Sequence, residues 1–409
     1  MIRMKGRGMQ DTADKPVTGG EAIEMNGHGR LGFSLDEYRR RYEVVLAGMA
    51  ALGVDVLLVR GPENITYLTG YETPGYYKYH CLIVAPGEEP VFVLRRFEEL
   101  NIPEYSWLTR HVPVDDWEHP PDVTVRTLRD MGLDDKRIGV EKAGWFFTVE
   151  EFETLRTSMP KAGFVDATAI VEEARLVKSD EEIAMMRRSA KILDKAVQTG
   201  IDAVACGRND DDVNAVVNKV LFENGGEYMG LPPFILSGPR TCLPHQTARS
   251  EIIGERDLVY FEVSCSQYRY AAAVMRTIFV GAPEARQRAC AEAVLEGLQA
   301  AMDTMRAGVS SEAVDAAARG VIEKAGFGEY FRHRLGYSIG VNYPPDWGEG
   351  QILSLRKGEP RLLEENMTFH MVPLCLVYRE FGIGFSATVR VTRTGCEEFS
   401  ALPRTIIVK

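Results

Sequence analysis

Two hydrophobic periods alternate along the first part of the chain, one helical and one typical of strands. Ser34 can cap a helix that reaches Ala51, and the apolar positions with helical spacing are Tyr38, Tyr42, Val45, Leu46 and Met49. A continuous apolar run at 54–59 predicts a buried strand, and 61–70 begins as a turn. Further strands are predicted at 81–84, 91–94 and 137–141, and a further helix at 148–159. This alternation predicts a three-layer α/β domain.

The pattern changes between residues 165 and 178, where we place a domain boundary. Ser179 and Glu182 have the spacing of a capping box, which predicts a long helix ending near residue 205. Beyond it, helices are predicted at 210–224, 284–306 and 310–325, with strands at 258–264, 272–280, 367–373 and 386–391. The predicted organisation is a disordered tail (1–33), an N-terminal α/β domain (34–168) and a C-terminal α+β domain (169–409).

Composition and charge exclude several classes of protein. A chain of 409 residues that is 45% hydrophobic and 26% charged can build two cores and has the composition of a soluble globular protein. A net charge of −11 without a Lys/Arg-rich run argues against a nucleic-acid partner. No run approaches the roughly 20 apolar residues of a membrane span, and the N-terminal stretch lacks a signal-peptide segment. The 7 cysteines have no framework spacing, so we expect reduced thiols and a cytoplasmic protein.

Two residues with acid–base chemistry stand out in the C-terminal half. Glu262 lies in the apolar strand 258–264, and carboxylates are seldom buried without a partner or a function. It could form an ion pair with Arg276 or Arg269, or it could face a pocket as a base or nucleophile. His245 follows a Ser-Gly-Pro loop. A lone histidine is by default a packed or surface residue, but imidazole can give and take a proton in one turnover.

Aromatic residues and a second histidine supply the candidate substrate contacts. Tyr337 could be core or could offer a phenol hydrogen bond, and His370 lies in phase with Val372 on one strand face. Prolines and Trp347 make the segment 343–349 a rigid wall suited to a small cationic or zwitterionic ligand, although a tight surface loop has the same pattern. An aromatic cluster in the N-terminal half, which taken alone indicates packing, consists of Tyr71, Tyr76, Tyr77, Tyr79 and His80.

Three stretches together resemble the C-terminal half of the pita-bread superfamily, which includes methionine aminopeptidase, aminopeptidase P, prolidase and creatinase. They are Phe-Glu-Val-Ser at 261–264, Gly-Tyr-Ser-Ile-Gly-Val-Asn-Tyr-Pro-Pro-Asp-Trp-Gly-Glu at 336–349 and Met-Thr-Phe-His-Met-Val-Pro at 367–373. The resemblance implies a creatinase-like N-terminal domain followed by a pita-bread catalytic domain. Metal-dependent members place Asp, Asp, His, Glu and Glu where this chain has Glu262, Ala273, Tyr337, Val372 and Ser386. Because four of these five are poor ligands for a divalent cation, the resemblance implies a metal-free branch with no cofactor.

Within the metal-free branches, the chain resembles the ectoine hydrolases more than the creatinases, which carry glutamates at the positions of Met275 and Val372. The resemblance implies that Glu262 attacks the substrate or activates water, and that His245 protonates the departing nitrogen. The substrate contacts that it implies are Tyr337, Arg334, which would hold a carboxylate, His370, Tyr343 and Trp347.

The same resemblance implies a homodimer in which Tyr77 and its neighbours form a lid over the partner's active site. The expected activity is metal-independent hydrolysis of a non-peptide C–N bond in a small zwitterion, first of all the opening of the ectoine ring to N-acetyl-2,4-diaminobutyrate. Two alternatives stay open. One is a creatinase-like amidinohydrolase acting on another small nitrogen compound, and the other is a catalytically inactive pita-bread binding protein.

Overall fold

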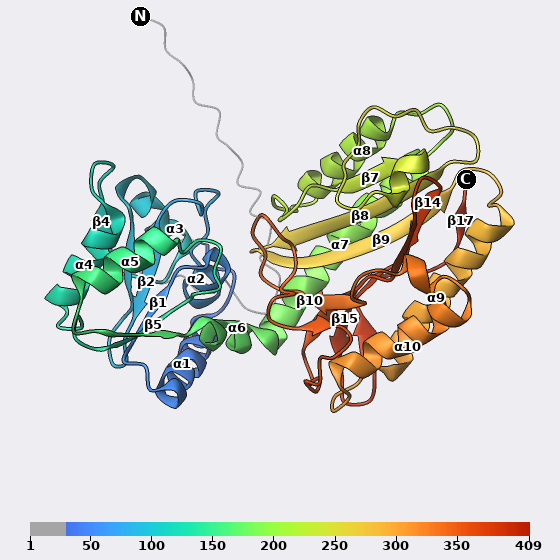
Figure 1. The fold of residues 1–409 in the computed structure, drawn as a ribbon. Coiled ribbons are helices and arrows are strands. Elements are labelled where there is room, and N and C mark those ends of the chain that lie inside the picture. The colour runs from blue at the N-terminus through green and yellow to red at the C-terminus, as the bar shows by residue number, and fades with distance from the viewer. Residues whose placement is uncertain (1–29) are drawn as a thin grey trace, which may run out of the picture.

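The computed structural model describes residues 30–409, which form two domains joined by a helical connection (Figure 1). The N-terminal domain contains one six-stranded sheet with the strand order β4-β3-β2-β1-β5-β6. Its strands are β1 (Val56–Val59), β2 (His80–Val84), β3 (Val91–Arg95), β4 (His111–Val114), β5 (Arg137–Val140) and β6 (Gly163–Asp166). The central strand β1 pairs antiparallel with β2 and parallel with β5.

Helices cover both faces of this sheet. They are α1 (Leu35–Leu52), α2 (Pro62–Thr69), α3 (Ile102–Tyr105), α4 (Pro120–Asp130) and α5 (Val149–Ser158), with a 3₁₀ helix at Arg96–Asn101. Leu57 and Val59 of β1 pack with residues of α1 and α2, whereas Val56 and Leu58 pack with α4 and α5. Alternate residues of one strand therefore enter two separate cores, and the three-layer α/β prediction is confirmed.

The C-terminal domain has two main sheets, ordered β17-β9-β8-β7 and β11-β10-β12-β15-β16, and a hairpin β13-β14. Helix α6 (Thr168–Leu176) connects the two domains and packs in the N-terminal core beside α1 and α2. The helices of the C-terminal domain are α7 (Asp180–Ala203), α8 (Asp210–Glu223), α9 (Ala285–Thr304) and α10 (Ser311–Lys324), with 3₁₀ helices at Gly238–Cys242 and Gly328–Tyr330. Its strands are β7 (Phe234–Ser237), β8 (Leu258–Gln267), β9 (Tyr270–Phe279), β10 (Gly336–Ser338), β11 (Ser354–Leu355), β12 (Thr368–Met371), β13 (Leu374–Val377), β14 (Phe381–Gly384), β15 (Ala387–Val391), β16 (Cys396–Glu398) and β17 (Ile407–Val408).

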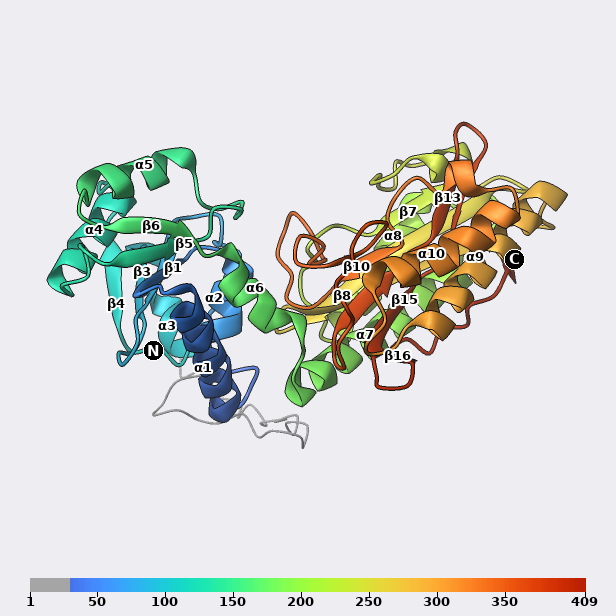
Figure 2. The same ribbon diagram turned by 60° about the horizontal axis from the view of Figure 1, so that its bottom comes forward.

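Each main sheet of this domain packs against one pair of helices on its outer face (Figures 1 and 2), and the inner faces of the two sheets meet where β9 contacts β15. Phe261 and Val263 of β8 pack with α7 and α8, and Phe369 of β12 packs with α9 and α10. Tyr260 of β8 and Tyr337 of β10 instead share a separate cluster. The α+β prediction is confirmed. No helix within residues 30–409 is long and apolar enough to cross a membrane.

The sequence patterns located most long elements well, but they gave no prediction for α4 or for short strands such as β4 and β7, and they misread the start of α2. The capping box of Ser179 and Glu182 is present and opens α7. The segment 61–70, expected to begin as a turn, is instead helix α2, because Pro62 has the backbone angle of a first helical turn and Gly70 ends the helix at φ 79°. The predicted boundary region contains α6.

The expected disordered tail falls mostly on residues 1–29, which lie outside the described part of the chain. Its last residues are ordered, because Leu31 and Phe33 are buried. They pack in a cluster with Tyr38 of α1 and with Met185 and Tyr270 of the C-terminal domain. Ordered structure therefore begins before Ser34.

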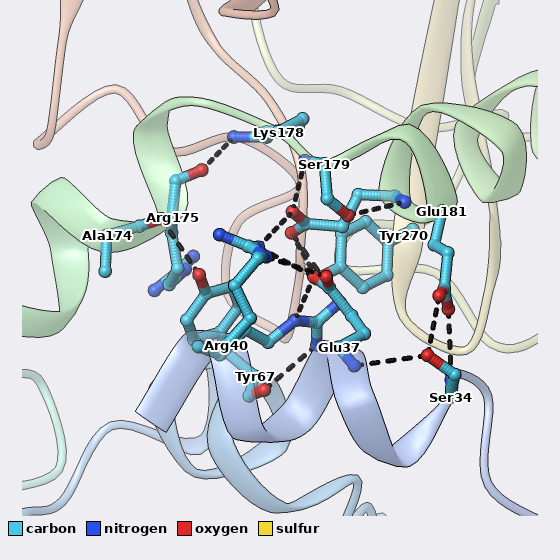
Figure 3. A network of polar contacts seen from close by, with 12 residues as sticks. Ser34, Glu37, Arg40, Tyr67, Ala174, Arg175, Lys178, Ser179, Glu181 and Tyr270 are labelled. Carbon is cyan, nitrogen blue, oxygen red and sulfur yellow. Dashed lines mark hydrogen bonds and ion pairs between the residues drawn. The ribbon is translucent and has the colours of Figure 1, made fainter. Parts of the chain in front are cut away.

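A buried polar network that includes Glu37, Ser179 and Tyr270 connects α1 to the start of α7 (Figure 3). Arg41 contacts carboxylates of both helices. Arg41 Nε lies 2.7 Å from Glu37 Oε1, and Arg41 donates to the carbonyl of Tyr67 at 2.9 Å. Its third nitrogen lies 3.9 Å from Glu182 Oε1, which also accepts a hydrogen bond from Tyr270 at 2.6 Å. Burial acts to raise the pKa of Glu37, but Arg40 and Arg41 hold it below its usual value. One guanidinium thus compensates carboxylates of both domains.

Arg41→Ala is expected to lower the free energy of unfolding by about 3 kcal/mol or more, because it leaves Glu37 and Glu182 buried without their shared cation. The free energy is measured from urea denaturation. The matched control is Arg39→Ala, which removes an exposed pair with Asp36 on the same helix and should change stability by less than about 0.5 kcal/mol. Equal effects of the two substitutions would contradict this account of the junction.

Candidate active site

Glu262 lies on the face of β8 that points away from α7 and α8, and it is 8% exposed. Phe234 of β7 and Met275 of β9 lie opposite it in the sheet. The surrounding buried cluster is apolar and aromatic and consists of Phe234, Leu236, Tyr260, Met275, Tyr337, Trp347, Val372 and Leu374. The hydroxyl of Tyr260 donates to Glu262 Oε2 at 2.5 Å. A carboxylate is therefore held in an apolar pocket by a phenol.

The alternative ion pair for Glu262 is not formed. Arg276 donates to the backbone carbonyls of Pro403, Met275, Ser386 and Leu402. Arg269 is occupied by Asn342 and by the carbonyl of Tyr228. Without a neighbouring cation, burial raises the pKa of Glu262 to about 7; the Tyr260 hydrogen bond opposes the rise and the charge of Asp346 adds to it. Glu262 can therefore exchange a proton near neutral pH.

His245 lies at the exposed rim of this cluster, in the segment between β7 and β8. Its ring centroid is 5.7 Å from that of Phe234, and the Phe234 ring is 5.2 Å from that of Trp347. The backbone of His245 has φ 54°, a left-handed conformation that costs a non-glycine residue free energy. Such outliers concentrate at functional sites, so this strain supports a role for the imidazole. The structure thus places both proposed acid–base residues around Phe234.

Tyr337, Trp347 and His370 form one hydrogen-bonded chain. The indole N–H of Trp347 donates to the Tyr337 hydroxyl at 2.9 Å, and that hydroxyl lies 2.9 Å from His370 Nδ1. On its other side, His370 Nε2 lies 2.7 Å from Ser386 Oγ. His370 is completely buried; burial and the charge of Arg276 lower its pKa to about 3, so its ring is neutral. Tyr337 and Trp347 border the Glu262 pocket directly, and His370 supports them from behind.

A buried ionic contact fixes the loop that carries Trp347. Glu349 Oε1 accepts from Arg175 at 2.5 Å and Oε2 accepts from Lys178 at 2.7 Å. The backbone N–H of Glu349 donates to the carbonyl of Ser338 at 2.6 Å. Burial acts to raise the pKa of Glu349, but Lys178 and Arg175 hold it below its usual value. The loop is therefore tied to the strand of Tyr337 and to the connection between the domains.

The other residues predicted to contact the substrate, Tyr343, Arg334 and Tyr77, do not belong to the Glu262 cluster. The Tyr343 hydroxyl is 2.7 Å from Thr66 Oγ1, away from the Glu262 cluster. The exposed Arg334 has its guanidinium 4.9 Å from the Tyr337 ring centroid. Tyr77 is 66% exposed and belongs to none of the buried clusters formed by residues 30–409. Its expected position over a partner's active site stays a prediction.

Tyr343 and Arg334 line an interdomain cavity of about 360 Å³. Its wall also includes Glu63, Glu172 and Arg175. Burial raises the pKa of Glu63 to about 7, although the charge of Arg175 opposes the rise. The cavity adjoins the Glu262 pocket through the 343–351 loop and has a size suited to a small molecule.

Comparison with known proteins places this geometry in a family. Residues 41–177 match the creatinase/prolidase N-terminal domain, and residues 184–393 match metallopeptidase family M24. An uncharacterized hydrolase/peptidase of Sinorhizobium fredii is 33% identical over 389 residues, covering 92% of this chain and 97% of its own. The chain belongs to the M24 family.

Other members show the range of the family. The ectoine hydrolase of Halomonas elongata is 29% identical over 397 residues, covering 93% of this chain and 99% of the relative. A Xaa-Pro dipeptidase of Pyrococcus horikoshii is 25% identical and covers 91% of this chain and all of its own. The fold matches that of the Thermococcus sibiricus prolidase, with a TM-score of 0.82 and 24% identity over 92% of this chain and 100% of the prolidase. This M24 protein therefore has relatives that are named for different substrates.

The residues of this M24 protein do not fit the metal that the family name implies. No group of three or more His, Cys, Asp or Glu side chains that could hold a metal occurs within residues 30–409. Among the five positions where the resemblance implies ligands, Ala273 and Val372 offer no donor atom. The hydroxyls of Tyr337 and Ser386 are occupied by His370. This donor set contains one carboxylate, that of Glu262, which is too few for a dinuclear site.

Sequence reasoning missed Tyr260, a residue of the pocket, and Ser264, which lies on the same face of β8. Both lie two positions from Glu262 on the same strand, so the two-residue period of side-chain direction could have placed them on its face. Tyr260 is the hydrogen-bond donor to Glu262. The Ser264 hydroxyl is buried and has no hydrogen-bond partner among the described residues.

Glu262→Gln is expected to stabilise the protein increasingly as pH rises from about 5 to about 8. In the wild type the folded state holds the Glu262 proton more tightly than the unfolded state, because the folded pKa is about 7 and the ordinary value is 4.5. Stability is therefore lost as pH rises through this window, and the neutral amide avoids that loss, which is worth on the order of 3 kcal/mol. The readout is the urea-denaturation free energy at both pH values. The exposed Glu292→Gln is the control, and an equal pH trend in both variants would refute the raised pKa.

Proposed function

We propose that this M24 protein is a metal-independent hydrolase of a C–N bond in a small zwitterion, and that its substrate is ectoine. The observation that carries the proposal is Glu262, a carboxylate in an apolar pocket whose pKa lies near neutrality and whose partner is a phenol rather than a cation. Such a group can act as a base or as a nucleophile without a metal. The similarity to the ectoine hydrolase of Halomonas elongata, which extends over 93% of the chain, supports this substrate.

The chemistry divides between Glu262 and His245. Ectoine is a cyclic amidine that carries a carboxylate, and its ring opens when oxygen bonds to the amidine carbon. In the general-base route, Glu262 takes a proton from water as the water oxygen bonds to that carbon. His245 then donates a proton to the ring nitrogen as its C–N bond breaks. In the covalent route, a Glu262 oxygen bonds to the amidine carbon, and the ring C–N bond breaks as His245 protonates the nitrogen. Water then bonds to the same carbon and displaces the Glu262 carboxylate, which leaves the acetamide. Both routes add one water and give N-acetyl-2,4-diaminobutyrate.

Recognition of the substrate carboxylate falls to a cation near this pocket. The guanidinium of Arg334 stacks on Tyr337 and makes no ion pair with a carboxylate of residues 30–409, so it is available to a ligand. It lines the interdomain cavity beside the Tyr337 ring, which supports this role. Tyr77, exposed on its own subunit, would complete the site from the partner in a homodimer.

The first test is incubation of the purified protein with ectoine in the presence of EDTA, with the product followed by mass spectrometry. The expected product has gained the mass of one water, and its yield does not depend on added metal. Glu262→Gln and His245→Asn should each lower kcat by about 100-fold or more. Asparagine is chosen for position 245 because it tolerates the left-handed backbone there.

Turnover that requires added metal would overturn the metal-independent mechanism. No turnover under either condition would remove ectoine, and creatine-like and other cyclic nitrogen compounds would then test the amidinohydrolase alternative. Wild-type rates in either variant would refute the roles given to Glu262 and His245.

A second prediction concerns Tyr260, which stabilises the ionised form of Glu262. Tyr260→Phe removes that hydrogen bond and should raise the pKa of Glu262 further above about 7. Since the ionised carboxylate is the active form, the acidic limb of the kcat/KM profile should move to higher pH. The exposed Tyr378→Phe serves as control and should leave the limb in place. A limb that is unmoved in Tyr260→Phe, or one that moves to lower pH, would contradict the assignment of Glu262.

A further inference from the structure

The buried side chains of Ser386 and His370 determine the direction in which the Tyr337 hydroxyl can donate its proton. Ser386 Oγ accepts the backbone N–H of Met275 at 2.6 Å and lies 2.7 Å from His370 Nε2. His370 Nδ1 lies 2.9 Å from the Tyr337 hydroxyl, which also accepts the indole N–H of Trp347 at 2.9 Å. Because the indole and the backbone amide can only donate, both ends of the chain have one fixed direction.

Two proton arrangements satisfy these distances, and they differ in the tautomer of His370. In the first, Ser386 donates to Nε2 and Nδ1–H donates to Tyr337, so the Tyr337 proton is left without a partner. In the second, Tyr337 donates to Nδ1 and Nε2–H donates to Ser386, so the Ser386 proton is left without a partner. Each arrangement therefore leaves one hydroxyl proton for something outside the chain.

Burial distinguishes the two arrangements. Ser386 is 0% exposed and is enclosed between β12, β9 and the start of β15, where a free O–H would pay the full cost of desolvation. Tyr337 is 9% exposed as a whole residue and belongs to the cluster that surrounds Glu262, so a ligand that enters this pocket can accept its proton. The free proton is therefore less costly on Tyr337.

We propose that the Ser386–His370 pair fixes Tyr337 as a hydrogen-bond donor into the Glu262 pocket, where it stabilises the tetrahedral state of the substrate. This inference rests on the proposed function and deepens it, since it assigns Tyr337 as a catalytic residue and His370 and Ser386 as positioning residues. The low pKa of His370 is required by both arrangements, because each needs a neutral ring with one acceptor nitrogen, so the choice between them rests on burial.

The chemistry of an amidine explains why such a donor acts in the transition state. A protonated amidine has no lone pair on either nitrogen that can accept a hydrogen bond. When oxygen bonds to the carbon, a nitrogen regains its lone pair and becomes an acceptor. A donor fixed beside that carbon therefore binds the tetrahedral state better than the substrate, which raises kcat and changes KM little. No proton leaves Tyr337 in this step.

The first test needs no substrate. Nitrogen-15 NMR of histidine-labelled wild-type protein reports which ring nitrogen of His370 carries the proton, with the signal assigned from its loss in His370→Gln. The expected tautomer is Nδ1–H. Observation of the Nε2–H tautomer would overturn the proposal. Since the measurement is made without substrate, a failure of ectoine as substrate would leave this result standing and would count only against the proposed function.

The second test is kinetic. Tyr337→Phe should lower kcat by about 100-fold with KM changed by less than about 3-fold. Ser386→Ala should move the His370 proton to Nε2, turn the Tyr337 proton inward and lower kcat by about 10-fold, whereas Ser386→Thr, which keeps a hydroxyl, should restore both readouts. The control Ser311→Ala removes another fully buried hydroxyl and should change stability but neither readout. An unchanged kcat in Tyr337→Phe, or in Ser386→Ala with a shifted tautomer, would overturn the proposal.

Discussion

The buried contact of Glu349 with Arg175 and Lys178 is the constraint on which the site depends. Removing either cation would leave a desolvated carboxylate, so the loop cannot leave this position without a large free-energy cost. The contact also explains two glycines of the 336–349 motif. A side chain at Gly340 would meet Lys178 Cε at 2.8 Å and Glu349 Oε1 at 2.9 Å, and one at Gly348 would meet the Tyr337 ring at 2.5 Å. The glycines of the motif therefore leave room for Trp347 to pack against Tyr337.

Because this loop is fixed, the pocket can hold Glu262, whose ionisation there is energetically unfavourable. Glu262 has apolar neighbours and no cation, and its ionisation in the folded protein costs stability. The same desolvation that costs stability moves the pKa to where a base is useful, so stability and reactivity oppose each other at this one residue. The fold tolerates the cost because the polar groups that need partners, among them Arg276 and Arg269, find them in backbone carbonyls elsewhere.

The sequence determined the architecture more fully than the site. Long helices such as α7 are recognisable from their capping residues and apolar periodicity. The alternation of helix and strand patterns predicted the three-layer domain. Short elements such as α2 were not recognised as helices, because a Gly-Pro start is also a turn signal. Glu262 could be singled out because a carboxylate interrupts an apolar strand. The hydrogen-bonded series of Trp347, Tyr337, His370 and Ser386 could not be predicted, because it joins residues from three separate segments. The direction of its hydrogen bonds also depends on burial, which the sequence does not specify.

The apolar Val372 and the hydrogen-bonded side chains of Trp347, Tyr337, His370 and Ser386 shape the same pocket. Carboxylates at Ala273 and Val372, next to Glu262 and without a cation between them, would repel one another and raise the pKa of Glu262 beyond a useful range. Apolar residues at these positions avoid that repulsion. They also remove any polar partner that Tyr337 could have had on that side. In the proposed arrangement the Tyr337 proton has no acceptor among residues 30–409, so it is kept for the substrate, as a metal keeps an open coordination position in other enzymes.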